Sequence, residues 1–220
     1  MNFAPVNIIS RTVTTCTDSG YGTLTVLVYI ISLLFMMALS LAVSEILARV
    51  LDRNGYNVNK AIMHILSGVL STILILRYGF SITALQGMFL FFVLVYASVS
   101  DLTFREVDDF VWVIVLALAL ANITETGIFS MLVGAAAVFI IQMGTVVFSE
   151  KRVYGGADIK LSTSLAFLLG CTRGLLALIL GLGTAVIFMM IYRKLRGTEN
   201  KKAFPLVPFL SFGAMVMFLV

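Results

Sequence analysis

The chain has 220 residues, of which 60% are hydrophobic and only 12% are charged. Its mean hydropathy is +1.08. Soluble domains carry about 45–50% apolar and about 25% charged residues, so the composition excludes a soluble globular protein and predicts a polytopic, all-α membrane protein. The net charge of +4 does not require a nucleic-acid partner, because basic residues that gather on one side of a membrane leave such a balance.

The first residues, 1–21, are polar and lack the basic region and adjoining apolar run of a signal peptide, so we expect an extracytoplasmic tail. Beyond it, the apolar runs predict about eight transmembrane helices, because a bilayer core needs about 20 apolar residues per helix. We expect the helices near 23–48, 61–78, 82–100, 109–123, 127–148, 158–170, 172–193 and 204–220.

The fourth and sixth of these segments are short. Each can cross only where the bilayer thins or where one of its ends is buried in the bundle, and seven spans plus a re-entrant segment is the alternative. The connections between the segments are short and polar, which leaves no room for a soluble domain. We therefore divide the chain into the tail, a three-helix membrane part at 22–100, and a second membrane part at 101–220 that holds two acidic stretches.

The placement of lysine and arginine predicts the orientation of the chain. Twelve basic residues fall on one side if loops 51–60, 101–108, 149–157 and 194–203 share it: Arg49, Arg53, Lys60, Arg105, Lys151, Arg152, Lys160, Arg193, Lys194, Arg196, Lys201 and Lys202. The other side holds Arg11, Arg77 and Arg173. The richer side is therefore expected to be cytoplasmic, with both termini outside.

Two acidic residues stand where apolar runs meet the predicted cytoplasmic side. Asp101 ends the third run and Asp158 begins the sixth, so both are expected at the same depth. An N-cap role is the alternative for Asp158 and for Asp109, which opens the fourth run. Asp101 is harder to explain as a charge that a helix end merely tolerates, because an acid at the C-terminal end of a helix opposes the helix dipole, and this favours a functional role.

Two carboxylates at one depth permit a specific chemistry if they lie close together. One of them keeps a proton because two ionised groups would repel each other. The ionised member can then take a proton from water while the protonated member polarises a peptide carbonyl, which is the chemistry of an aspartyl protease. This reaction needs no metal and no cofactor. Gly155 and Gly156, just before Asp158, either allow unusual dihedrals and close approach of a substrate or simply form a turn.

Three segments resemble the type IV prepilin peptidases, which are GxGD-type membrane aspartyl proteases. GGADIKL (155–161) is similar to the GxGD signature, with Ala157 in place of the second glycine. DLTFREVDDFVW (101–112) is similar to the first motif of the family, with Asp108 in place of its proline, and FPLVPFLSFGA (204–214) resembles the last-helix signature. The resemblance implies that Asp101 and Asp158 are the catalytic pair and that 101–220 is the peptidase core.

The resemblance also implies the substrate. Family members cleave pilin-like precursors, which carry a short basic leader on the cytoplasmic side and an apolar helix in the membrane. Gly155 and Gly156 would then shape the substrate site, and Asp108 and Asp109 would pair with basic leader residues. Lys160 would contact substrate or a lipid headgroup, and the alternative is a side chain that only anchors its helix at the membrane surface.

Relatives that also methylate the new N-terminus carry a large insertion between their first two spans, often with paired CxxC motifs. Here that loop is LDRNGYNVNK, which has no cysteine and no room for a zinc subdomain. The resemblance therefore implies a short, peptidase-only form, like those that serve tight-adherence pili or archaellins. The alternative function is a small transporter or channel that uses the same acids as a proton or cation relay.

A few other residues carry structural expectations. Glu45 and Arg49 have the spacing of an i,i+4 ion pair, and His64 is expected to be a packed, hydrogen-bonded residue. Cys16 and Cys171 either pair on the outer side or remain thiols. Close helix approach is expected at four glycines: Gly134, Gly144, Gly181 and Gly183.

Overall fold

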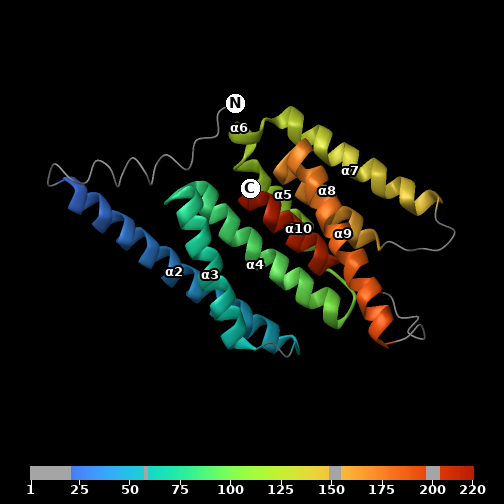
Figure 1. The fold of residues 1–220 in the computed structure, drawn as a ribbon, viewed down its shortest axis with the longest axis horizontal. Coiled ribbons are helices and arrows are strands. Elements are labelled where there is room, and N and C mark those ends of the chain that lie inside the picture. Colours follow the sequence, from blue (N-terminus) through green and yellow to red (C-terminus); the bar gives the residue numbers. More distant parts are fainter. Residues whose placement is uncertain (1–20, 57–58, 149–154, 197–203) are drawn as a thin grey trace. The chain divides into compact units, whose positions relative to one another are not determined.

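The computed structural model describes residues 21–56, 59–148, 155–196 and 204–220, and all regular structure in these ranges is helical (Figure 1). The helices are α2 (Tyr21–Arg53), α3 (Lys60–Tyr78), α4 (Ile82–Thr103), α5 (Asp109–Leu120), α6 (Ile123–Thr126), α7 (Ile128–Phe148), α8 (Gly156–Leu169), α9 (Cys171–Arg196) and α10 (Val207–Leu219). The predicted all-α membrane architecture is confirmed, and each of the eight predicted segments coincides with a helix.

The helices differ in their ability to cross a bilayer. Five of those described, α2, α3, α4, α7 and α9, are long and apolar enough to do so. The other three predicted spans form α5, α8 and α10, which have 12, 14 and 13 residues. At 1.5 Å per residue these helices reach about 18–21 Å, less than the roughly 30 Å of a bilayer core. The polar stretch at 1–20 lies outside the described residues, and Tyr21 already belongs to α2.

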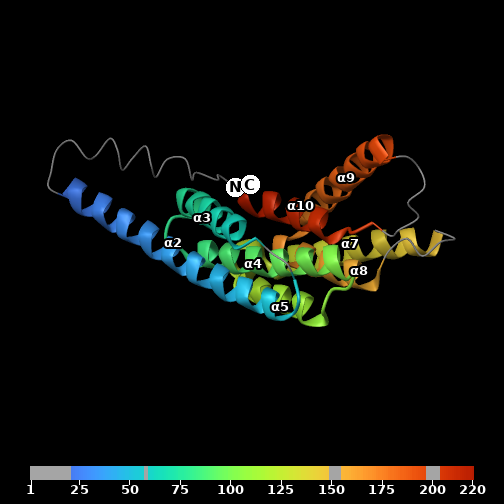
Figure 2. The same cartoon turned by 90° about the horizontal axis from the view of Figure 1, so that it is seen from below.

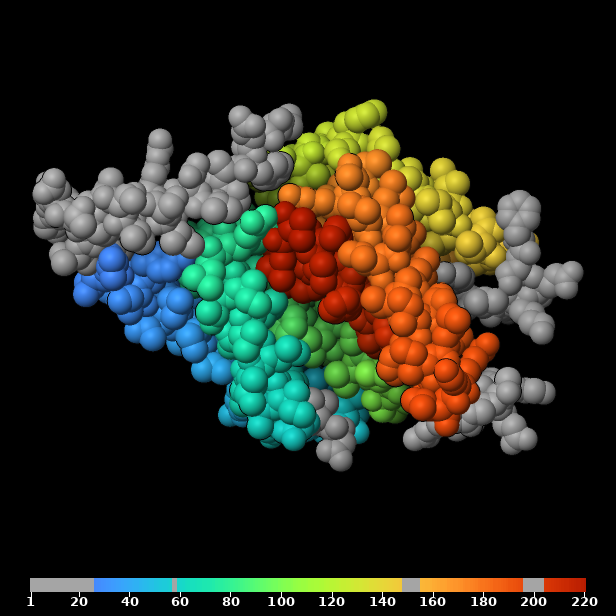
Figure 3. All heavy atoms as spheres, in the orientation of Figure 1, coloured from blue at the N-terminus to red at the C-terminus, as the bar shows by residue number. Residues whose placement is uncertain are grey.

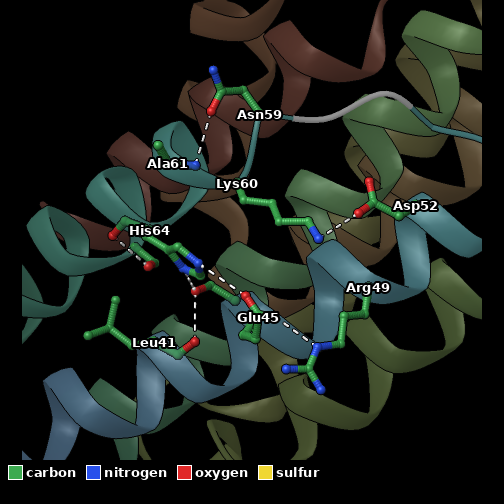
Figure 4. Close-up of polar contacts among 10 residues, drawn as sticks. Leu41, Glu45, Arg49, Asp52, Asn59, Lys60, Ala61 and His64 are labelled. Atoms are coloured by element: carbon green, nitrogen blue, oxygen red, sulfur yellow. Dashed lines mark hydrogen bonds and ion pairs between the residues drawn. The ribbon is translucent and has the colours of Figure 1, made fainter.

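The chain forms two compact units, Met1–Met88 and Phe89–Val220. In the first unit, α2 packs along α3. Ion pairs and hydrogen bonds join the two helices near the end of α2 and the start of α3 (Figure 4). Lys60 Nζ lies 2.8 Å from Asp52 Oδ2. The predicted division of the chain between residues 100 and 101 stays a prediction.

His64 joins α3 to two residues of α2. Its Nδ1 lies 2.6 Å from Ser44 Oγ, and its Nε2 lies 3.2 Å from Glu45 Oε2. The other oxygen of Glu45 accepts a hydrogen bond of 2.8 Å from Arg49 Nε. The expected i,i+4 pair and the hydrogen-bonded histidine are therefore both confirmed (Figure 4).

The second unit is built around α8. This helix contacts α5, α7, α9 and α10, and more than half of its residues are buried. Figures 1 and 2 show α7 and α9 next to α8, and these two helices also contact each other. A buried cluster from four helices holds the unit together: Val138, Ala166, Leu178 and Leu210. The shortness of α8 is tolerated because neighbouring helices enclose most of it.

Glycines allow some of these helices to touch at backbone distance. A Cβ at Gly134 would lie 2.8 Å from the backbone nitrogen of Cys171, and one at Gly181 would lie 3.0 Å from Leu210 Cα. The expectation is wrong for Gly144 and Gly183, because a Cβ at either position would meet nothing within 4 Å.

Candidate functional site

Asp101 lies near the end of α4, and its side chain is turned into the protein. Only 8% of the residue is exposed. Its Oδ2 accepts a hydrogen bond of 3.0 Å from the backbone N–H of Val207, the first residue of α10 and 106 positions away. The first turn of a helix has unpaired N–H groups and a partial positive charge. The carboxylate thus opposes the dipole of its own helix but complements that of α10.

Asp158 occupies the first turn of α8 and is partly buried. The N-cap residue of α8 is Gly155, so the alternative that made Asp158 the N-cap is wrong. The same holds for Asp109, since Asp108 is the N-cap residue of α5. The side chain of Asp108 makes no capping hydrogen bond, and Gly155 has no side chain that could make one.

Asp101 and Asp158 belong to the same compact unit, although 57 positions separate them in the sequence. They lie close enough for the charge of Asp101 to act repulsively on a charged Asp158. Each carboxylate reaches this place from a different helix, α4 or α8, and the first turn of α10 holds Asp101 in position. Such repulsion is the condition under which a pair of acids keeps one proton.

Gly155 and Gly156 lie directly before this pair and are exposed. A Cβ at Gly155 would stand 3.4 Å from Asp158 Oδ2, whereas one at Gly156 would meet nothing within 4 Å. Gly155 has φ −73° and ψ 144°, which any residue can adopt. The expected unusual dihedrals are therefore absent at both glycines, and what they supply is open space beside the Asp158 carboxylate.

Lys160 and Asp109 form an exposed ion pair that joins the first turns of α8 and α5. The distance between Lys160 Nζ and Asp109 Oδ1 is 2.7 Å. Trp112 Nε1 donates to the same oxygen at 3.1 Å, and Lys160 Nζ lies 5.8 Å from the centre of the Trp112 ring. Asp108 accepts a hydrogen bond of 2.7 Å from the Tyr96 hydroxyl. The three charged residues that are predicted to contact the substrate thus all have partners within the protein.

Ser162 and Gln142 are polar neighbours of the site that the sequence analysis did not single out. Ser162 Oγ lies one helical turn after Asp158, 2.7 Å from the Asp158 carbonyl oxygen and 2.6 Å from Gln142 Oε1. Gln142 is 1% exposed, and its Nε2 has no hydrogen-bond partner within the described ranges. The sequence does indicate Gln142, because it is an amide side chain within the apolar run 127–148. Polar groups are costly inside a membrane and are often functional there.

No group of three or more metal-ligating side chains occurs among the described residues. Cys171 begins α9, and its backbone N–H donates to Ser130 Oγ at 3.2 Å. Cys16 lies outside the described ranges, so the expected choice between a disulfide and two thiols stays open.

Comparison with known proteins identifies the part of the chain that carries this site. Residues 88–191 match the model of the type IV leader peptidase family. This range includes both aspartates and the two glycines. No curated protein and no solved structure matches the chain. Residues 88–191 of this multi-pass membrane protein are therefore similar to the type IV leader peptidase family, and the similarity covers both aspartates.

Proposed function

We propose that this protein is a membrane aspartyl endopeptidase that removes the basic leader from type IV pilin-like precursors. The observation that carries the proposal is that Asp101 of α4 acts electrostatically on Asp158 of α8 within the region that matches the peptidase family. A single buried acid at a helix end would have only a local explanation. Two acids that repel each other lower the stability of a fold, and such arrangements are typical of functional sites.

The mechanism follows from a pair that holds one proton. The ionised carboxylate takes a proton from a water molecule as the water oxygen attacks the scissile peptide carbonyl. The protonated carboxyl group donates a hydrogen bond to the carbonyl oxygen and stabilises the charge that develops there. Proton transfer to the leaving nitrogen then breaks the C–N bond, and the pair returns to its starting state. The hydrogen bond from Val207 keeps Asp101 in place during these steps.

The substrate enters from the side where basic residues gather, which we assign to the cytoplasm. The open space beside Gly155 and Gly156 admits the extended backbone of the precursor. Asp108 and Asp109, both exposed, lie at the start of α5 and would attract leader lysines and arginines. We assign no methyltransferase activity to this chain, because its loop between the first two spans is only about ten residues long.

The test is cleavage of a co-expressed precursor by the wild-type protein and by Asp101→Asn and Asp158→Asn. Each substitution keeps the size of the side chain but removes its ability to ionise, so each should abolish processing while the protein remains in the membrane. Asp52→Asn is the matched control, because Asp52 is an acid at the end of α2 that pairs with Lys60 in the first unit. This variant should process the precursor as the wild type does.

Near-normal cleavage by either site variant would contradict the two-aspartate mechanism. The relay alternative makes a different prediction: proteoliposomes would show proton or cation flux that depends on Asp101 and Asp158, and no precursor would be cleaved. Measuring flux and cleavage on the same preparations therefore separates the two functions.

A further inference from the structure

An open groove lies between α9 and α10 in the second unit, with a volume of about 400 Å³. The two helices run antiparallel and touch where Gly213 meets Ala177 and Gly181. Beyond that crossing they diverge, as the steep inclination of α9 in Figure 2 shows. Both helices lie open on the face seen in Figure 3. The groove thus widens from a glycine contact toward the beginning of α10.

The groove is apolar along its whole length. Ile187, Phe188 and Ile191 line it from α9, and Phe209 and Phe212 line it from α10. Its one hydroxyl group, that of Thr184, donates to the carbonyl oxygens of Leu180 and Gly181 in its own helix, each at 2.9 Å. The groove therefore presents no unsatisfied polar group, and its occupant must be apolar.

Aromatic rings form the wide end of the groove. The Phe188 ring lies 5.3 Å from that of Phe209, and the Phe209 ring lies 5.2 Å from that of Phe204. Such clusters present a large and rigid apolar surface, and aromatic anchors of this kind dominate the energetics of many interfaces. About half of Phe188 and Ile187 remains exposed, so this surface is still available.

The groove begins next to Val207, the residue that contacts Asp101. Pro208 and Phe209, both in its wall, directly follow Val207, whose N–H holds the Asp101 carboxylate. With a rise of 1.5 Å per residue along a helix, the groove begins about 2–3 Å along α10 from the residue that contacts Asp101. A chain cleaved at Asp101 and Asp158 could thus continue directly into this groove.

We propose that the α9–α10 groove binds the apolar helix of the precursor, on the mature side of the bond that is cleaved. This inference rests on the proposed function and adds how the substrate is held. An amphipathic or apolar helix in a hydrophobic groove is a common recognition mode. A lipid chain would be equally apolar, but the start of the groove beside Val207, which contacts Asp101, favours a substrate helix.

The binding test uses a photo-crosslinking phenylalanine analogue at Ile187, in the full-length Asp158→Asn protein so that the precursor is retained. The matched control carries the analogue at Val186, the preceding residue of α9, which is exposed to a similar extent (58% against 60%) but does not line the groove. We expect a crosslink to the apolar helix of the precursor from position 187 and little from position 186. Crosslinks from 187 to lipid alone would overturn the proposal.

The kinetic test fills the groove with Ile187→Trp and compares two substrates: the whole precursor and a peptide with the leader but no apolar helix. For the precursor, kcat/KM should fall by about tenfold or more, mainly through KM, since a central contact would be lost. For the peptide, Ile187→Trp should change kcat/KM by less than about twofold. Val186→Trp should also change kcat/KM by less than about twofold, with either substrate. Equal effects of Ile187→Trp on both substrates would overturn the groove proposal. Failure of the wild type to cleave either substrate would instead overturn the proposed function.

Discussion

At the scale of single residues, the ion pair between Lys160 and Asp109 makes a prediction about leader recognition. Lys160 Nζ lies 2.7 Å from Asp109 Oδ1 and therefore neutralises the carboxylate that would attract basic leader residues. Lys160→Met should free Asp109 and lower KM for strongly basic leaders. Because the pair is exposed and screened by solvent, the change in KM should not exceed about fivefold. Steady-state cleavage of leaders with different numbers of lysines measures it.

Lys60→Met is the control for this change. Lys60 forms an equivalent ion pair with Asp52, at 2.8 Å, in the first unit of the chain. Its removal frees a carboxylate that has no part in the proposed leader site, so KM should not change. A rise in KM with Lys160→Met would mean that Lys160 itself contacts the substrate, and the effect should then be independent of leader charge.

At the scale of helices, the hydrogen bond between α7 and α8 makes a prediction about stability. Ser162→Ala leaves both ends of the buried Gln142 amide without a partner, which should lower the free energy of unfolding by about 1–3 kcal/mol. Gln142→Leu removes the whole amide and should cost much less, because the Ser162 hydroxyl still donates to the Asp158 carbonyl oxygen. The double variant should therefore be more stable than Ser162→Ala alone.

Unfolding of the four proteins in detergent micelles measures this cycle. Ser164→Ala is the matched control. Ser164 is buried in the same helix, but its hydroxyl donates to the carbonyl oxygen of Leu161, which also belongs to α8. It should have little effect on stability. A double variant less stable than both single variants would contradict the assigned role of the unpaired Gln142 amide.

The helices were largely predictable, and their mutual contacts were not. Apolar runs located every long helix to within a few residues, because the bilayer sets both length and composition. The helical turn α6 was missed, since NITET has the composition of a loop. The boundary position of Asp101 and Asp158 was readable from the sequence. The hydrogen bond from Val207 to Asp101 was not, because it joins residues 106 positions apart through the packing of α10.

At the scale of the whole molecule, the orientation of the chain decides where a precursor can be cleaved. Helix α4 has 22 residues, a length of about 33 Å, so it is long enough to hold Ser81 and Asp101 at opposite faces of a bilayer. The distribution of lysine and arginine predicts that the end with Asp101 is cytoplasmic. If the orientation were reversed, a basic leader would have to cross the membrane before its removal.

Single cysteines introduced into a Cys16→Ser, Cys171→Ser background test this orientation. In intact cells, a membrane-impermeant maleimide should label Ser81→Cys and Glu125→Cys, which precede α4 and α7 on the predicted outer side. It should label Asn54→Cys and Glu106→Cys only after the cells are opened, because these residues lie at the predicted inner ends of α2 and α4. The opposite pattern would place Asp101 and Asp158 outside. Cleavage at the cytoplasmic face would then be impossible, even if both aspartates proved essential.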